Sequence, residues 1–102
     1  MTTIRVRQEV AQFAELMELK LSMHDEERGE KWKEEPQEFF TARLEEEYAE
    51  LLEAVISGKM KNIQYEAADM ANFLMMLSWK VQDDWAEEMA KIAPPWVGGC
   101  SR

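Results

Sequence analysis

Helix-breaking residues are scarce in this chain, and that scarcity limits its fold more than any other feature. Only four glycines and three prolines occur in 102 residues. Apolar residues recur at i, i+3, i+4 and i+7 along long stretches, which is the spacing of amphipathic helices. A chain of this length forms a single domain. We therefore predict an all-α domain over residues 1–102, an antiparallel bundle of three to four helices, with a helical core over residues 1–93 and a tail over residues 94–102.

The apolar spacing divides the chain into four predicted helices, which cover residues 3–24, 37–57, 62–82 and 83–92. The second helix ends at Gly58, and the following connection is so short that the third must fold back antiparallel beside it. Between Ala67 and Trp79 the third helix is apolar on most sides, so protein should surround it. With eight methionines and four tryptophans, the chain has more apolar surface than one small bundle can bury. We predict a homodimer or a homotetramer.

Apolar positions also indicate which side chains should be buried. In the first helix they form one stripe, made of Val6, Val10, Phe13, Met17 and Leu21. In the second and third helices we expect Tyr48, Leu51 and Phe73 to belong to the core.

Charge and the rarity of two residue types exclude several functions. The net charge is −9 and the pI is near 4.6, so nucleic acid and an anionic membrane would be repelled. No apolar run is long enough to span a bilayer and the amino terminus is polar, so we expect a cytoplasmic protein. Because His24 and Cys100 are the only histidine and cysteine, a disulfide, a thiolate site and a multi-histidine site are excluded within one chain. Any chemistry must rest on carboxylates.

Two groups of carboxylates stand out on neighbouring predicted helices. One covers residues 45–53 and the other is Glu66 with Asp69. Glu47 and Glu50 are three residues apart, as are Glu66 and Asp69, so each pair shares one helix face. Many acids in such a run are ordinarily solvated, and that interpretation stays open for the first group.

Glu66 and Asp69 are harder to explain as surface residues. Glu66 lies on an apolar helix face, where an ionised carboxylate is costly unless it is paired or metal-bound. Arg43 and Lys80 are the nearest basic candidates by sequence. Carboxylates without histidine or cysteine suit Mg²⁺ or Mn²⁺. A di-iron site would need a Glu-x-x-His motif, and His24 does not follow a glutamate at that spacing.

The motif EEYAEL over residues 46–51, followed by EAAD over residues 66–69, resembles the ExxE…ExxD signature of the all-α nucleoside triphosphate pyrophosphohydrolases, the MazG-like superfamily. The continuation MANF over residues 70–73 is similar as well. The segment over residues 13–32 resembles short MazG-like proteins of phages and bacteria. The resemblance therefore covers most of the chain.

This resemblance implies an enzyme that removes pyrophosphate from a (deoxy)nucleoside triphosphate and leaves the monophosphate. Carried over by motif, Glu47, Glu50, Glu66 and Asp69 would hold Mg²⁺. Glu46 would be a further ligand or the base that orients the attacking water, so that Glu46, Glu47 and Glu50 form the catalytic set.

Candidate substrate contacts come from the loop and from the third helix: His24, Lys31, Trp32, Lys33, Asn72 and Lys80. Trp32 could stack on the base, the lysines could reach phosphate, and Asn72 could bond the sugar or the base. Each has an ordinary structural alternative, such as a tryptophan that caps the bundle or a histidine that ends a helix.

Three functions remain open at this point. The first is a Mg²⁺-dependent pyrophosphohydrolase of nucleotide-pool cleansing. The second is a non-catalytic helical dimer that binds nucleotide or protein, whose acids would be solvated. The third is phosphoribosyl-ATP pyrophosphohydrolase, which shares the bundle and the motif. It ranks last because the loop and the residues Ala71-Asn72-Phe73 do not suggest it.

Overall fold

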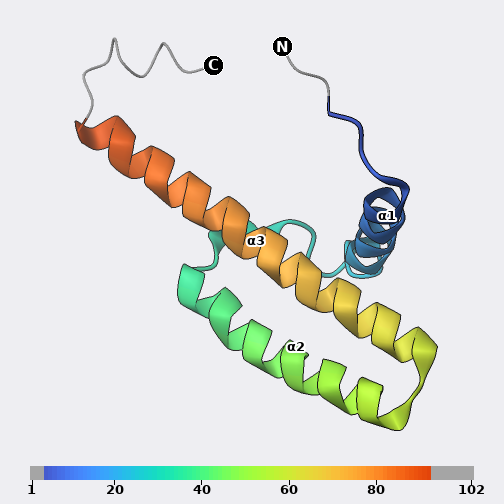
Figure 1. Cartoon of the computed structure of the whole chain (residues 1–102). Helices are drawn as coiled ribbons and strands as arrows, with labels where there is room; N and C mark the ends of the chain where they lie inside the picture. Colours follow the sequence, from blue (N-terminus) through green and yellow to red (C-terminus); the bar gives the residue numbers. More distant parts are fainter. Residues whose placement is uncertain (1–3, 93–102) are drawn as a thin grey trace.

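The computed structural model describes residues 4–92, and all regular structure in that range is helical (Figure 1). Helix α1 spans Gln8–Ser22, a short 3₁₀ helix η1 spans Lys31–Glu34, α2 spans Gln37–Ser57 and α3 spans Met60–Ile92. The predicted all-α bundle is confirmed. The predicted tail over residues 94–102, which includes Cys100, lies outside the described residues.

Helices α2 and α3 form a long antiparallel hairpin (Figure 1). Its turn depends on Gly58, whose φ of 71° lies in the left-handed region that glycine adopts without strain. The Gly58 amide donates to the carbonyl oxygens of Ala54 at 3.1 Å and Val55 at 3.2 Å. These bonds satisfy the last turn of α2 and end the helix where the sequence predicts.

One predicted boundary is wrong, because α3 runs without a break through residues 82 and 83. Neither glycine nor proline interrupts this stretch, and the polar Asp83 and Asp84 leave the backbone hydrogen bonds of the helix intact. Contacts also support the helix here. Lys80 Nζ lies 3.8 Å from Asp84 Oδ1, one turn away, and Gln37 Nε2 donates to Asp84 Oδ2 at 2.9 Å. The chain therefore has three α-helices in its described part.

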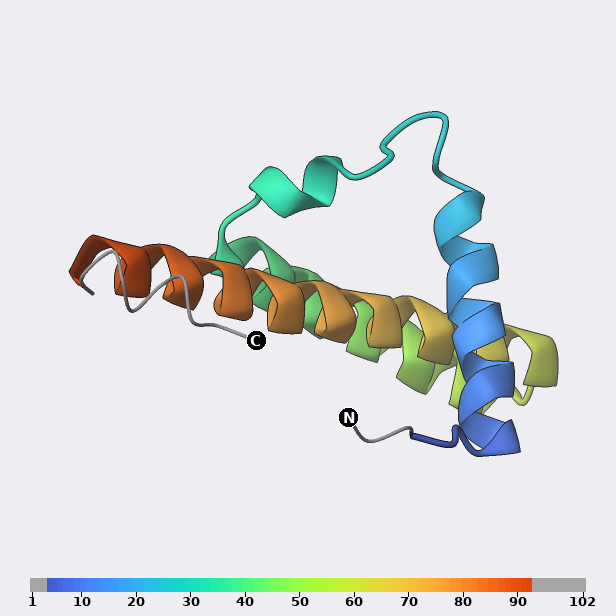
Figure 2. The same cartoon turned by 90° about the horizontal axis from the view of Figure 1, so that it is seen from above.

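Helix α1 crosses the amino-terminal half of α3 steeply instead of lying parallel to the hairpin (Figure 2). The half-buried residues of α1 lie in its carboxyl-terminal half. Met17 and Leu21 are half-buried there, whereas Val6, Val10 and Phe13 are exposed. The predicted apolar stripe is thus buried at one end only.

The core of the single chain is small and lies between the hairpin and η1. Phe40 and Ala68 are fully buried, and Met76 is nearly so. Trp32 of η1 covers this core, with its ring edge-to-face against Phe40 and Trp79.

Not every expected core residue is buried. Leu51 and Phe73 are half-buried, but Tyr48 is 51% exposed, so its assignment to the core is wrong for the single chain. No helix within residues 4–92 is both long and apolar enough to cross a membrane.

Candidate active site

A cleft of about 500 Å³ lies between α1, η1 and the hairpin. The connection from α1 to η1 arches away from the hairpin and borders this space (Figure 2). Acidic, basic and aromatic side chains all line the cleft. They include Glu47 and Asp69, Lys20 and Arg43, and Trp32 and Phe73.

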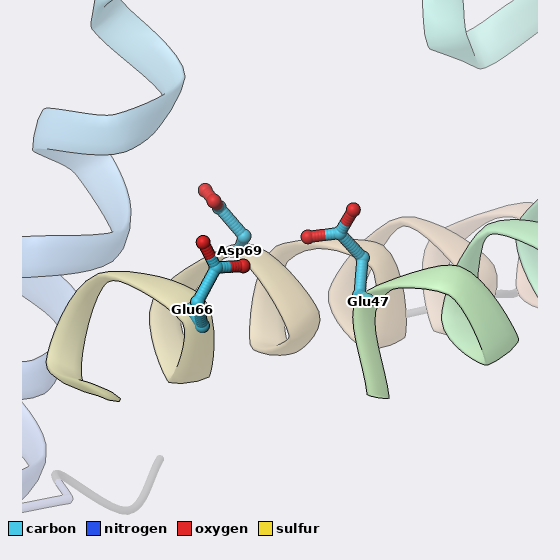
Figure 3. Close-up of side chains that lie close together, drawn as sticks. All are labelled: Glu47, Glu66 and Asp69. Carbon is cyan, nitrogen blue, oxygen red and sulfur yellow. The ribbon is translucent and has the colours of Figure 1, made fainter. Parts of the chain in front are cut away.

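Three carboxylates converge beside this cleft (Figure 3). Glu47 projects from α2, whereas Glu66 and Asp69 project from the facing side of α3. One oxygen of each lies within 4.8 Å of one oxygen of the other two. The antiparallel hairpin creates this group, because it places the middle of α2 opposite the start of α3. We call Glu47, Glu66 and Asp69 the acidic cluster.

The surroundings of the acidic cluster make its negative charge costly. Burial raises the pKa of Glu47 to about 7, and the neighbouring Glu50 and Asp69 carboxylates add to this effect while Arg43 opposes it. Burial, followed by neighbouring carboxylates, also raises the pKa of Glu66. The pKa of Asp69 is raised mainly by burial, against the opposing charge of Lys20.

One buried oxygen of the acidic cluster has no hydrogen-bond partner. Glu66 Oε2 is buried and makes no hydrogen bond, and Glu47 is only 5% exposed. Converging carboxylate oxygens, one of them unpaired, form a donor set that suits a hard divalent cation such as Mg²⁺ or Mn²⁺. The residues present therefore fit the metal that the sequence predicts.

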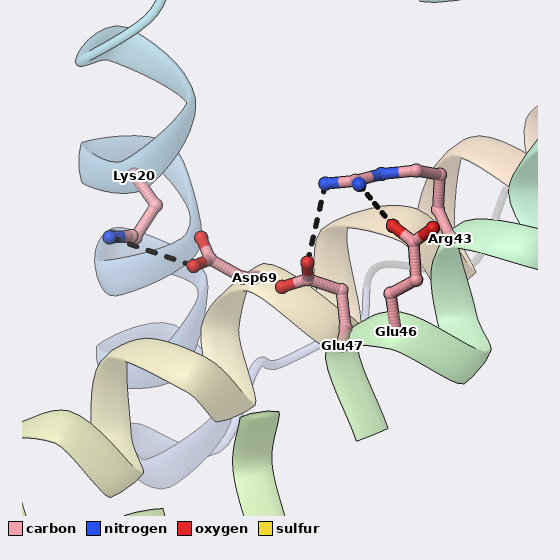
Figure 4. Close-up of polar contacts among 5 residues, drawn as sticks. All are labelled: Lys20, Arg43, Glu46, Glu47 and Asp69. Atoms are coloured by element: carbon pink, nitrogen blue, oxygen red, sulfur yellow. Dashed lines mark hydrogen bonds and ion pairs between the residues drawn. The ribbon is translucent and has the colours of Figure 1, made fainter. Parts of the chain in front are cut away.

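Two basic side chains face the acidic cluster from opposite sides (Figure 4). Arg43 Nη2 of α2 lies 3.3 Å from Glu47 Oε2, and its Nη1 bonds Glu46 Oε1. Lys20 Nζ of α1 lies 3.7 Å from Asp69 Oδ2. Sequence reasoning considered Arg43 as a partner but missed Lys20. No local pattern could have indicated Lys20, because its position depends on how α1 crosses α3.

The two remaining predicted acids lie beside the acidic cluster. Glu50 is exposed in the single chain, but its charge raises the pKa of Glu47 and Glu66, so it is close to them. Glu46 is exposed and held by Arg43. Neither residue belongs to the group of three converging oxygens.

Of the six predicted substrate contacts, the structure brings four to the cleft: His24, Lys31, Trp32 and Asn72. Lys33 and Lys80 point elsewhere. Lys33 Nζ bonds Glu30 and lies over the rings of Trp32 and Trp79. Lys80 donates to the main-chain oxygen of Lys33 at 3.1 Å.

Asn72 lines the cleft, and only the nitrogen of its side-chain amide has a hydrogen-bond partner. It is 4% exposed, and its Nδ2 donates to the main-chain oxygen of Met17 at 3.0 Å. Its Oδ1 is buried without a partner. A buried acceptor of this kind is costly unless a donor, such as a ligand, reaches it.

The fold and the site together define a class of protein, in which antiparallel helices share a carboxylate cluster suited to a divalent cation. This is the class of all-α nucleotide pyrophosphohydrolases. The family model for phosphoribosyl-ATP pyrophosphohydrolase matches residues 10–83, which is most of the chain. The chain belongs to this family, within the MazG-like all-α NTP pyrophosphohydrolase superfamily. No curated protein and no solved structure gave a significant match.

Membership of the family establishes the kind of reaction. The protein is a pyrophosphohydrolase, a hydrolase of acid anhydrides that acts on nucleotide-like substrates. The resemblance to the superfamily is thereby confirmed. The matching family carries the name of the substrate that sequence reasoning ranked last, so phosphoribosyl-ATP must be tested beside the nucleoside triphosphates.

Proposed function

We propose that this protein is a Mg²⁺-dependent pyrophosphohydrolase that converts a (deoxy)nucleoside triphosphate to the monophosphate and pyrophosphate, in cytoplasmic nucleotide-pool cleansing. The observation that carries this proposal is the convergence of Glu47, Glu66 and Asp69, with the buried Glu66 Oε2 unpaired. Solvated acids would instead have favoured a non-catalytic binding module. Both Glu66 and Asp69 are partly buried, which supports the enzyme.

The proposed metal ligands are Glu47, Glu66 and Asp69, joined by Glu50 from the next turn of α2. Bound Mg²⁺, or Mn²⁺ in its place, would neutralise phosphate charge and lower the pKa of a water molecule. Glu46 would be a further metal ligand or the base that accepts the proton of the attacking water. The water oxygen bonds to the α-phosphorus, the bond from this phosphorus to its bridging oxygen breaks, and pyrophosphate leaves.

Substrate contacts are proposed from residues that line the cleft. Trp32 covers the core, and it also lines the cleft. Its ring would therefore stack on the nucleotide base of a bound substrate. Lys31 and His24 would contact phosphate or sugar. The unpaired Oδ1 of Asn72 would accept a hydrogen bond from a sugar hydroxyl or a base amino group. Lys33 and Lys80, which were also predicted, lie outside the cleft lining.

Phosphoribosyl-ATP is the second candidate substrate, and the family match favours it. It shares the triphosphate chain of the first candidate, so the same acidic cluster would serve both. Phosphoribosyl-ATP carries an additional phosphoribosyl group, which the outer part of the cleft would have to accommodate.

We also propose that the protein assembles as a homodimer or homotetramer. Leu74, Val81 and Trp85 are exposed along one side of α3, and Leu52 and Val55 are exposed on α2. Exposed apolar side chains in such numbers are typical of an interface between subunits.

The experiment is a measurement of pyrophosphate release from all common NTPs and dNTPs and from phosphoribosyl-ATP, with and without Mg²⁺. Glu47→Gln should abolish release, because it removes one charge from the acidic cluster. Glu53→Gln, an exposed glutamate on the same helix, is the matched control and should retain activity. Folded wild-type protein that releases no pyrophosphate from any of these compounds would refute the proposal.

A further inference from the structure

Two side-chain cations contact the acidic cluster. Arg43 comes from α2 and Lys20 from α1, and each contacts a different carboxylate of the cluster. Both also line the cleft. Thus the cations and the carboxylates that they contact (Figure 4) line the same cleft.

These contacts and a divalent ion would use the same carboxylate oxygens. The three carboxylates of the acidic cluster, with Glu46 and the nearby Glu50, outnumber the two cations, which therefore neutralise the negative charge only in part. Lys20 and Arg43 would compete with the ion for Asp69 and Glu47, and they would be repelled by it.

The positions of both side chains leave them able to serve a second partner. The guanidinium of Arg43 lies 5.0 Å from the ring centre of Phe73, and Lys20 Nζ lies 4.8 Å from the ring centre of Tyr65. These rings would still hold the two cations at the cleft after their carboxylates were taken by a metal ion. Arginine and lysine bind phosphate through charge-assisted hydrogen bonds.

We propose that Lys20 and Arg43 are exchangeable counter-ions: they partly neutralise the acidic cluster when no divalent ion is bound, and they bind the phosphate chain of the substrate once a divalent ion occupies the cluster. This inference rests on the proposed function, because it requires a metal ion at Glu47, Glu66 and Asp69. It adds two phosphate-binding residues that the motif does not include. It also requires that one substitution of Lys20 or Arg43 raise the affinity for the metal ion and lower the affinity for the phosphate chain.

The test measures two affinities of the same variants. The first is for Mn²⁺ alone, and the second is for inorganic tripolyphosphate in saturating Mg²⁺, which has no base or sugar. Arg43→Gln and Lys20→Gln should each bind Mn²⁺ more tightly, by about threefold or more, because a competing cation is gone. They should bind tripolyphosphate about tenfold more weakly or worse, because a charged phosphate contact is lost.

Matched variants separate this role from a general change of charge. Lys91→Gln removes the same charge at the far end of α3, where Lys91 pairs with Glu88 at 3.7 Å, and should change neither affinity. Arg43→Lys retains a cation and should recover most of the tripolyphosphate affinity. If Arg43→Gln does not fold, Lys20→Gln provides the same comparison at Asp69.

The outcomes distinguish this inference from the proposed function. Wild-type protein that binds no Mn²⁺, or binds it equally well after Glu47→Gln, would overturn both. Mn²⁺ binding that depends on Glu47 but is unchanged or weakened in Arg43→Gln and Lys20→Gln would overturn the exchange alone. Unchanged tripolyphosphate affinity in these two variants would do the same.

Discussion

Asn72 of α3 donates a hydrogen bond from Nδ2 to the main-chain oxygen of Met17 in α1, at 3.0 Å. This bond joins two helices that cross steeply (Figure 2), and Asn72 lies one helical turn after Asp69. Because the amide nitrogen is used in this way, the amide oxygen is the part of Asn72 that remains for a ligand. One residue thus fixes α1 against the hairpin and presents an acceptor in the cleft wall.

Replacing Asn72 should therefore affect stability and substrate binding together. Asn72→Leu removes the side-chain bond that joins α3 to α1, whereas the Met17 carbonyl keeps its place in the hydrogen bonding of α1, so the free energy of unfolding should fall by about 1 kcal/mol. It should also raise KM, because the acceptor is lost. Urea unfolding and steady-state kinetics measure the two effects. Asn62→Leu, at an exposed position of the same helix, should change neither, and an Asn72→Leu protein as stable as wild type would contradict the role of this bond.

The pKa of Glu47 predicts how the metal-free protein responds to pH. The folded protein keeps a proton on this carboxyl up to about pH 7, whereas the unfolded chain releases it near the ordinary value of 4.5. Between these values the folded state binds more protons, so its free energy of unfolding must fall as pH rises. The raised pKa values of Glu66 and Asp69 act in the same direction.

Urea unfolding in a chelator should show this loss, amounting to about 1–3 kcal/mol between pH 4.5 and pH 7. Glu47→Gln should flatten the dependence, because the glutamine carries no charge at any pH. Mg²⁺ should restore stability at the alkaline end, since it binds the folded state. A free energy of unfolding that rises across this range would show that the carboxylates are not destabilised by their surroundings.

Local signals in the sequence were sufficient to predict the hairpin and the approach of three carboxylates across it. Gly58 marks the end of α2, and the short connection requires an antiparallel neighbour. Once these helices lie side by side, the spacing of Glu47, Glu66 and Asp69 brings their carboxylates together. These features depend on contacts close in sequence or on helical periodicity.

Features that depend on the packing of α1 could not be predicted in the same way. Lys20 approaches Asp69 only because α1 crosses α3 steeply, and no periodicity specifies a crossing angle. Tyr48 has the spacing of a core residue but is exposed in the single chain. The boundary expected at Asp83 failed for another reason, since polar residues alone do not end a helix.

Gly58 offers a direct test of the hairpin turn. Gly58→Ala should lower the free energy of unfolding by about 1 kcal/mol, because a φ of 71° places its Cβ against the following carbonyl. The loss would not come from a clash with neighbouring side chains, since nothing lies within 4 Å of a Cβ added at Gly58. Thermal unfolding measures the change. Gly58→Asn should cost less, because asparagine tolerates this conformation; equal losses in the two variants would argue against backbone strain.

The exposed apolar side of α3 predicts an oligomer that a charged substitution on this side would disrupt. Trp85 is 63% exposed and Val81 lies one turn before it, with Leu74 two turns further back. In a homodimer or homotetramer these side chains would be buried against a neighbouring subunit. Val81→Glu would place an unpaired charge in that contact and should reduce the mass measured by sedimentation equilibrium, whereas Glu88→Gln, at an exposed polar position, should not. A wild-type protein that sediments as a monomer at high concentration would show that this apolar side is not a subunit contact.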